Sequence, residues 1–289
     1  MSRYAESTYQ ELKQVIAENY QLQTDEIALY NGATAAIFAL IKSLKYKDVF
    51  LYAPLFGEYE KACITAKKHV YKINRITDEK SLPTDDSIVV FVNPSTPEGS
   101  YENLDTLLEI WMEKDCAIIL DESFLEFESL ISCREQIKNY KKLYIIQSFS
   151  KFYSCGGVRV GAIFAHKKSI KKLPQPLWNL SSFDVEFLKQ RLNDEEFKLQ
   201  TQELHKKQKT ELQEILQESQ LFDEIVESDA NFILTYSANG KKIFKHLLEH
   251  KILVRKCGSF DYLNNNWLRF AVKDTLAQQA LKEALIAFT

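Results

Sequence analysis

The central part of the chain alternates between short apolar runs and segments whose apolar residues have helical spacing, such as residues 35–44 and 104–113. The runs are rich in β-branched and aromatic residues and are apolar throughout, as strands covered on both faces are. Strands that alternate with helices in this way build a largely parallel sheet with helices on both faces. The sequence therefore predicts an α/β fold with strands in DVFLYAP (48–54), SIVVFVNP (87–94), CAIILDES (116–123), LYIIQSFS (143–150) and VGAIFA (160–165).

The pattern changes at LPQPLWNLSS, where two prolines interrupt regular structure. A long charged stretch, residues 187–218, follows and predicts one or two helices. Beyond it, strand-like segments (NFILTY, ILVRKC, NWLRFAV) alternate with helical ones, which is typical of a small α+β lobe. We place the lobe boundary near residues 174–182 and predict three parts, namely an N-terminal helix that packs with the small domain (1–23), a large domain (24–178) and a small C-terminal domain (179–289).

Composition and charge exclude several classes of protein. A chain of 289 residues with 45% hydrophobic and 27% charged residues can bury a large globular core. A net charge of −3 provides no basic field for nucleic acid, and no apolar run approaches the roughly 18 residues of a membrane span. The five cysteines are odd in number and lack a C-x-x-C pair, which argues against a disulfide framework or a zinc site. Because the start is polar and resembles no signal peptide, we predict a cytoplasmic protein with no metal, nucleic acid or membrane partner.

Lys151 is the first candidate catalytic residue. It follows the apolar run LYIIQSFS, where a lysine is unusual because desolvating an ammonium group is costly. Desolvation and a nearby cation lower the pKa of an amine and make it a nucleophile toward an aldehyde cofactor. Arg159 can provide that cation and can bind a phosphate dianion together with the hydroxyls of Ser148 and Ser150. The simpler alternative is a surface lysine and arginine in a glycine-rich loop.

Three further segments carry residues suited to such a cofactor. Asp121 ends a very apolar run, where a carboxylate can keep a pyridinium nitrogen protonated. The segment NGATAAIFAL places Ala33 and Thr34 at a predicted helix N-terminus, whose free N–H groups and dipole favour a phosphate. Phe56 in YAPLFGEY follows a predicted strand and can stack on a cofactor ring. Each feature also has a structural explanation, namely a turn cap, an ordinary helix cap and a core aromatic residue.

The order of these segments resembles that of the fold-type I aminotransferases, in particular the branch of histidinol-phosphate aminotransferase and threonine-phosphate decarboxylase. The resemblance extends over nearly the whole chain through NGAT, PLFGEY, NPSTPEG, DESF, SFSKFYSCGGVRVG, NFIL, ILVR and LRFAV. It implies the fold of the PLP-dependent transferases, with a mostly parallel seven-stranded sheet in the large domain and a smaller α+β C-terminal domain. It also implies pyridoxal 5'-phosphate (PLP) as the cofactor and a homodimer that acts on an amino donor and a 2-oxo acid.

The resemblance assigns roles to individual residues. Lys151 would form the Schiff base with the cofactor, Asp121 would bind its ring nitrogen and Phe56 would cover its ring. Arg269 in NWLRFAV would bind the α-carboxylate of the substrate, a role that suits a guanidinium fork. Arg255 in ILVRKC would meet the substrate's own phosphate or a second acidic group. The cofactor phosphate would be held by Ala33, Thr34, Ser148, Ser150 and Arg159, and by Tyr4 of the partner subunit.

Three departures from the family pattern concern the cofactor's phenolic oxygen and the start of the chain. Thr96 in NPSTPEG stands where relatives have an asparagine that donates to this oxygen, and a hydroxyl can replace that amide. Phe124 in DESF stands where aminotransferases often have a tyrosine, a second donor, and is more typical of the decarboxylases. The chain begins near the family's YPD point at Tyr4, so we expect a segment that helps to cover the substrate to be lacking.

Three functions are consistent with these residues. The first hypothesis is amino-group transfer between a small acidic or phosphorylated amino compound and a 2-oxo acid, with Lys151 moving the α-proton. The second is decarboxylation of a phosphorylated amino acid, which Phe124 and the segments ILVRKCGSF and LRFAV support. The third is a catalytically weak PLP-binding or regulatory protein, which the short start and Thr96 suggest. The presence together of Lys151, Asp121, Arg159 and Arg269 argues against the third.

Overall fold

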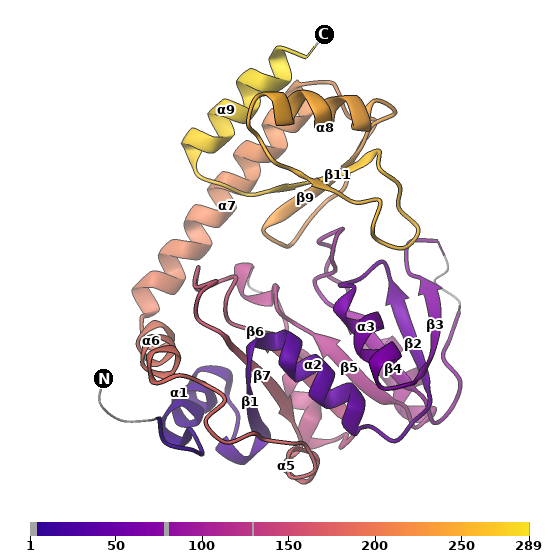
Figure 1. The fold of residues 1–289 in the computed structure, drawn as a ribbon, viewed down its shortest axis with the longest axis vertical. Coiled ribbons are helices and arrows are strands. Elements are labelled where there is room, and N and C mark those ends of the chain that lie inside the picture. The colour runs from indigo at the N-terminus through magenta and orange to yellow at the C-terminus, as the bar shows by residue number, and fades with distance from the viewer. Residues whose placement is uncertain (1–4, 78–80, 129, 289) are drawn as a thin grey trace.

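The computed structural model describes residues 5–77, 81–128 and 130–288, which form two lobes (Figure 1). The larger lobe contains a seven-stranded sheet built from β1 (Ile27–Asn31), β2 (Asp48–Ala53), β3 (His69–Asn74), β4 (Ile88–Val92), β5 (Ala117–Asp121), β6 (Leu143–Ser148) and β7 (Val160–Ala165). The strand order is β1-β7-β6-β5-β4-β2-β3. Strand β7 runs antiparallel to β1 and β6, whereas the pairs from β6 to β3 are parallel. The predicted mostly parallel seven-stranded sheet is therefore confirmed.

Burial on both faces explains why the strand sequences are apolar throughout. Every residue of β4, β5, β6 and β7 is buried. Because side chains alternate between the faces of a strand, neighbours such as Ile118 and Ile119 contribute to two different cores. Helices α2 (Gly32–Ser43), α3 (Glu58–Thr65) and α5 (Lys167–Ile170) pack on one face. Helices α1 (Gln10–Tyr20), α4 (Asp105–Glu113) and α6 (Ser182–Leu192) pack on the other.

The smaller lobe has its own sheet and core. Its four strands, in the order β10-β11-β9-β8, are all antiparallel to their neighbours. They are β8 (Glu224–Ile225), β9 (Phe232–Tyr236), β10 (Arg255–Lys256) and β11 (Trp267–Ala271). Apolar side chains from α7 (Glu195–Glu218), α8 (Gly240–Glu249) and α9 (Thr275–Ile286) complete the core of this lobe. These elements confirm the predicted smaller α+β lobe.

Two helices, α6 and α7, connect the lobes where the sequence indicated one or two. The charged stretch predicted as one or two helices forms the second half of α6 and all of α7. The two helices are separated at Asp194, which caps α7 by accepting from Phe197 N. The predicted boundary near residues 174–182 lies just before α6, whose apolar residues join the core of the larger lobe. Helix α1 packs against α6 and joins the same core. The division of the chain into three parts stays a prediction.

The carboxyl ends of the parallel strands meet at the edge of the sheet that faces the smaller lobe (Figure 1). Open α/β sheets bind ligands at this edge. The sequence-predicted residues of the larger lobe lie at or just after these strand ends, with Asp121 at the end of β5 and Lys151 three residues after β6. No helix of the described residues is long and apolar enough to cross a membrane.

Candidate active site

Lys151 lies between both lobes at the wall of a cavity. Its Nζ is 4.6 Å from the centre of the Phe124 ring. The side chain reaches solvent on the cavity side, yet protein crowds it on the other sides, and this burial is the main reason that its pKa lies below the ordinary value. Asp121 opposes the lowering, whereas the positive charges of Arg269 and Arg159 add to it. A lowered pKa increases the fraction of free amine that can attack an aldehyde.

Asp121 is buried and held in a fixed orientation by two donors. Tyr59 Oη donates to Asp121 Oδ2 at 2.8 Å, and the backbone N–H of Ser123 donates to Oδ1 at 3.0 Å. Sequence reasoning did not identify Tyr59, although it lies only three residues after Phe56 in PLFGEY. Phe56 itself lies just before α3 and is 42% exposed, and its carbonyl oxygen accepts from Tyr59 N at 3.1 Å.

The beginning of α2 forms a cradle for an anion. Gly32 has a φ of 79°, and a Cβ at this position would lie 2.7 Å from Arg159 Nη2, so the guanidinium rests directly against the helix N-terminus. Gly161 of β7 allows equally close packing, because a Cβ there would lie 2.3 Å from Ala33 N. No side chain caps the first turn of α2, which leaves its N–H groups available. The hydroxyl oxygens of Ser148 and Ser150, 3.1 Å apart, complete a donor set that fits a phosphate group together with Ala33 and Thr34.

The smaller lobe contributes Arg269, which contacts predicted site residues of the larger lobe directly or through Phe232. Arg269 Nη1 donates to Thr96 Oγ1 at 2.8 Å, so the threonine keeps its own proton for donation. The guanidinium carbon lies 4.5 Å from the centre of the Phe232 ring, and that ring meets Phe124 edge to face at 5.2 Å. Desolvation lowers the pKa of Arg269. Phe232 was not identified from the sequence, because its position in an apolar strand gives no chemical signal.

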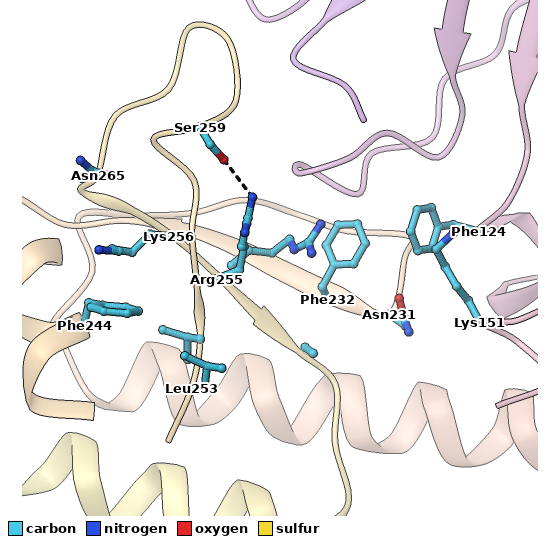
Figure 2. Close-up of a pocket in the computed structure, with 13 residues that line it drawn as sticks. Phe124, Lys151, Asn231, Phe232, Phe244, Leu253, Arg255, Lys256, Ser259 and Asn265 are labelled. Atoms are coloured by element: carbon cyan, nitrogen blue, oxygen red, sulfur yellow. Dashed lines mark hydrogen bonds between the residues drawn. The ribbon is translucent and has the colours of Figure 1, made fainter. Parts of the chain in front are cut away.

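A cavity of about 710 Å³ runs from this group into the smaller lobe. Figure 2 shows Lys151 and Phe124 at one end and Phe244, Leu253 and Lys256 at the other. Arg255 lies away from Lys151, and its Nη2 donates to Ser259 Oγ at 2.9 Å. Among the described lining residues, four are cations and none is a carboxylate. The cations are Lys151, Arg255, Lys256 and Arg269.

The cradle, the buried carboxylate and the desolvated lysine meet the requirements of a lysine-bound aldehyde cofactor with a phosphate and a ring nitrogen. The fold and this site define a two-lobed enzyme of the PLP-dependent class. The family model of aminotransferase class I and II matches residues 1–288, and the chain belongs to this family. The match confirms the predictions of an aminotransferase-type enzyme and of PLP as its cofactor. The roles of the individual residues stay predictions, and Tyr4 lies outside the described residues.

Similar proteins include both kinds of enzyme in the predicted branch. The chain is 27% identical over 307 residues to a putative threonine-phosphate decarboxylase from Caldanaerobacter subterraneus, which covers 99% of this chain and 83% of the relative. It is also 27% identical over 291 residues to the adenosylcobalamin biosynthesis bifunctional protein CobDQ from Leptospira interrogans, which covers 93% of this chain but only 33% of that protein. The crystal structure of the histidinol-phosphate aminotransferase from Clostridium acetobutylicum superposes with a TM-score of 0.88 at 26% identity, covering 99% of this chain and 90% of the other.

Proposed function

We propose that the protein transfers the amino group of a small compound that carries a second anionic group besides its α-carboxylate. The distribution of ion pairs carries this proposal. Of the six arginines in the described residues, three have carboxylate partners, namely Arg75, Arg134 and Arg191. The other three have no such partner among the described residues and all belong to the candidate site, namely Arg159, Arg255 and Arg269. Cations without a protein counter-charge in a concave site favour anionic ligands.

The three arginines suit three different anions. Arg159 lies in the phosphate cradle at α2 and would bind the cofactor. Arg269 is close enough to Lys151 to influence its pKa and would bind the α-carboxylate next to the reacting carbon. Arg255 lines the cavity farther from Lys151 and would bind the second anionic group (Figure 2). A phosphate or a distal carboxylate has the chemistry that a guanidinium fork recognises.

The chain's own residues would then perform distinct tasks. PLP, when bound, supplies an electron sink for the bond that breaks at the substrate's α-carbon. Lys151 would bind the cofactor and move the proton at the α-carbon with its Nζ, which the lowered pKa favours. Asp121 would keep the ring nitrogen protonated, and its hydrogen bonds from Tyr59 and Ser123 hold the carboxylate in place. Arg269 would orient the substrate through its carboxylate.

Decarboxylation of a phosphorylated amino acid is the second candidate. Phe124 stands at the cavity wall, in contact with Lys151 and Phe232, where a tyrosine is common in aminotransferases. The similarity to a putative threonine-phosphate decarboxylase covers 99% of the chain. The two reactions differ in which bond at the α-carbon lies perpendicular to the cofactor ring, so the same cations serve both.

The products decide between these functions. Holoenzyme is incubated with O-phospho-L-threonine or L-threonine, in the presence of 2-oxoglutarate, and both glutamate and carbon dioxide are measured. We expect glutamate to form faster from a phosphorylated compound than from its unphosphorylated counterpart. Carbon dioxide without glutamate would establish the decarboxylase instead. Bound cofactor with neither product would overturn both and leave the weak PLP-binding protein.

We also propose a homodimer, the assembly that is typical of the family. Tyr4 would reach the cofactor phosphate of the partner subunit. A fully active monomer in light scattering would contradict this proposal. The cytoplasmic location stays a prediction.

A further inference from the structure

The loop between β10 and β11, residues 257–266, extends from the smaller lobe to the larger one. Asp261 Oδ1 accepts from Lys72 Nζ at 2.7 Å, and Tyr262 Oη donates to the carbonyl oxygen of Lys72 at 3.3 Å. Lys72 belongs to β3, the edge strand of the large sheet. In Figure 1 the loop descends from the smaller lobe toward β2 and β3. The tip of the loop is therefore attached to the opposite lobe.

The same loop forms one wall of the cavity. Ser259 and Asn265 both line it, and Figure 2 shows the Arg255 guanidinium turned toward Ser259. The two sides of the loop touch at Gly258, where a Cβ would lie 2.3 Å from Asn265 Oδ1. The attachment at Asp261 and the cavity wall at Ser259 thus belong to one short, closely packed loop.

The orientation of Arg255 depends on this loop. Strand β10 contains only Arg255 and Lys256, and both are exposed. Within the described part of the chain, the guanidinium forms its hydrogen bond with Ser259 and no ion pair. The aromatic ring that it approaches, Phe260 at 5.7 Å, also belongs to the loop. A movement of the loop would therefore move the anion-binding group itself.

We propose that Lys72 is a positioning residue that holds the β10–β11 loop against the larger lobe and thereby fixes Arg255 for the distal anionic group of the substrate. The proposal rests on the proposed function, because it assigns that anionic group to Arg255. Lys72 is suited to the task because Glu60 Oε1 also accepts from it at 2.8 Å, which holds the ammonium between α3 and the loop. Its side chain is only 26% exposed, so solvent screens the pair less than a fully exposed one.

Hydrogen exchange of the holoenzyme tests the attachment without any substrate. Lys72→Met removes the ammonium, and Lys61→Met is the matched control, since Lys61 is 67% exposed and pairs with Glu58 in the same helix. We expect faster amide exchange in the peptide that covers residues 257–266 for Lys72→Met but not for Lys61→Met. Exchange in the strand peptide 143–148 should stay the same in both. An unchanged loop peptide in Lys72→Met would overturn the proposal.

Substrate selectivity tests the consequence for Arg255. Lys72→Met should raise the KM for O-phospho-L-threonine about threefold to fivefold, the range expected for a partly exposed ion pair, and leave that for L-threonine unchanged. In an Arg255→Gln background the same substitution should have no further effect. Faster loop exchange with an unchanged KM would overturn the positioning role. Failure of every amino compound to react would instead overturn the proposed function, while the exchange experiment still decides whether the loop is attached.

Discussion

The two ends of the cavity are built in different ways. At the cofactor end, functional groups project from the ends of fully buried strands, and Asp121 is fixed by the buried Tyr59. At the distal end, Arg255 projects from a strand of two exposed residues and is oriented by a loop that an ion pair attaches to the other lobe. With the proposed roles, the chemistry would be anchored in the core, whereas selectivity would depend on a surface loop, and such loops tolerate sequence changes more easily.

The largest effect should come from the cofactor end. Lys151→Ala removes the one lysine that lies beside both the phosphate cradle and Asp121 among the described residues. We expect the visible absorbance of the Schiff base between lysine and cofactor to disappear and turnover to fall on the order of 10⁴-fold for every substrate, because the same amine binds the cofactor and moves the proton. Absorbance and steady-state rates measure this. A loss confined to one substrate would contradict the role of Lys151, since the cofactor end should serve all substrates equally.

A smaller and selective effect should come from the distal end. Arg255→Gln removes the charge but keeps a polar side chain next to Ser259. The KM for a phosphorylated amino compound should rise about tenfold to a hundredfold, the size of a lost hydrogen bond to a charged group. Its unphosphorylated counterpart should be almost unaffected. Equal losses for the two compounds in steady-state kinetics would place Arg255 outside substrate selection.

A smaller effect should come from Thr96 and Phe124, which are expected near the cofactor's phenolic oxygen. The holoenzyme spectrum should change with pH as the proton between Lys151 Nζ and the cofactor's phenolic oxygen is lost. Thr96→Asn combined with Phe124→Tyr should improve hydrogen-bond donation to that oxygen and so stabilise its anion. The pKa of the proton shared by Lys151 Nζ and the phenolic oxygen should then fall by about one unit. An asparagine Oδ1 can still accept a hydrogen bond from Arg269, as Thr96 Oγ1 does in the wild type. A pH titration of the spectrum measures the change, and an unchanged or raised pKa would mean that Thr96 already provides the donor.

The smallest expected effect is on stability in the absence of cofactor. Burial lowers the pKa of Lys151 in the folded state, so the protonated amine destabilises the fold at neutral pH. This penalty is complete below the lowered pKa and disappears as the pH rises toward the ordinary lysine pKa of 10.5. Lys151→Met apoprotein should therefore be more stable than the wild type at pH 7, with the difference shrinking toward pH 10.5. Thermal unfolding at several pH values measures this, and a difference that grows with pH would have the wrong sign.

Sequence alone predicted the strands whose burial on both faces leaves a clear apolar pattern. Strands β4 to β7 were identifiable because burial on both faces makes them apolar throughout. Strand β3 was not, because it lies at the sheet edge and exposes His69 and Tyr71, which interrupts the apolar pattern. That edge strand carries Lys72, so the attachment of the loop was hidden as well.

The candidate site was predictable to a similar degree. Lys151 and Asp121 stand out because a charged residue at the end of an apolar run is costly to bury unless it is paired or functional. Tyr59 gave no such signal, since it acts through a contact with Asp121, which lies far from it along the chain. Ser259 gave none because a serine in a loop is common, and its contact with Arg255 depends on how the loop folds back. Such contacts are set by tertiary packing, which the local pattern of residues does not encode.

All of the proposed roles depend on the attachment of PLP to Lys151 at the cofactor end. Its most direct test is borohydride reduction of the holoenzyme, followed by proteolysis and mass spectrometry of the peptides. Reduction converts a Schiff base to a stable amine and so marks the lysine that carries the cofactor. We expect a single labelled peptide that contains Lys151 of the segment SFSKFYS. A label on any other lysine, or absorbance that borohydride cannot fix to this peptide, would contradict it.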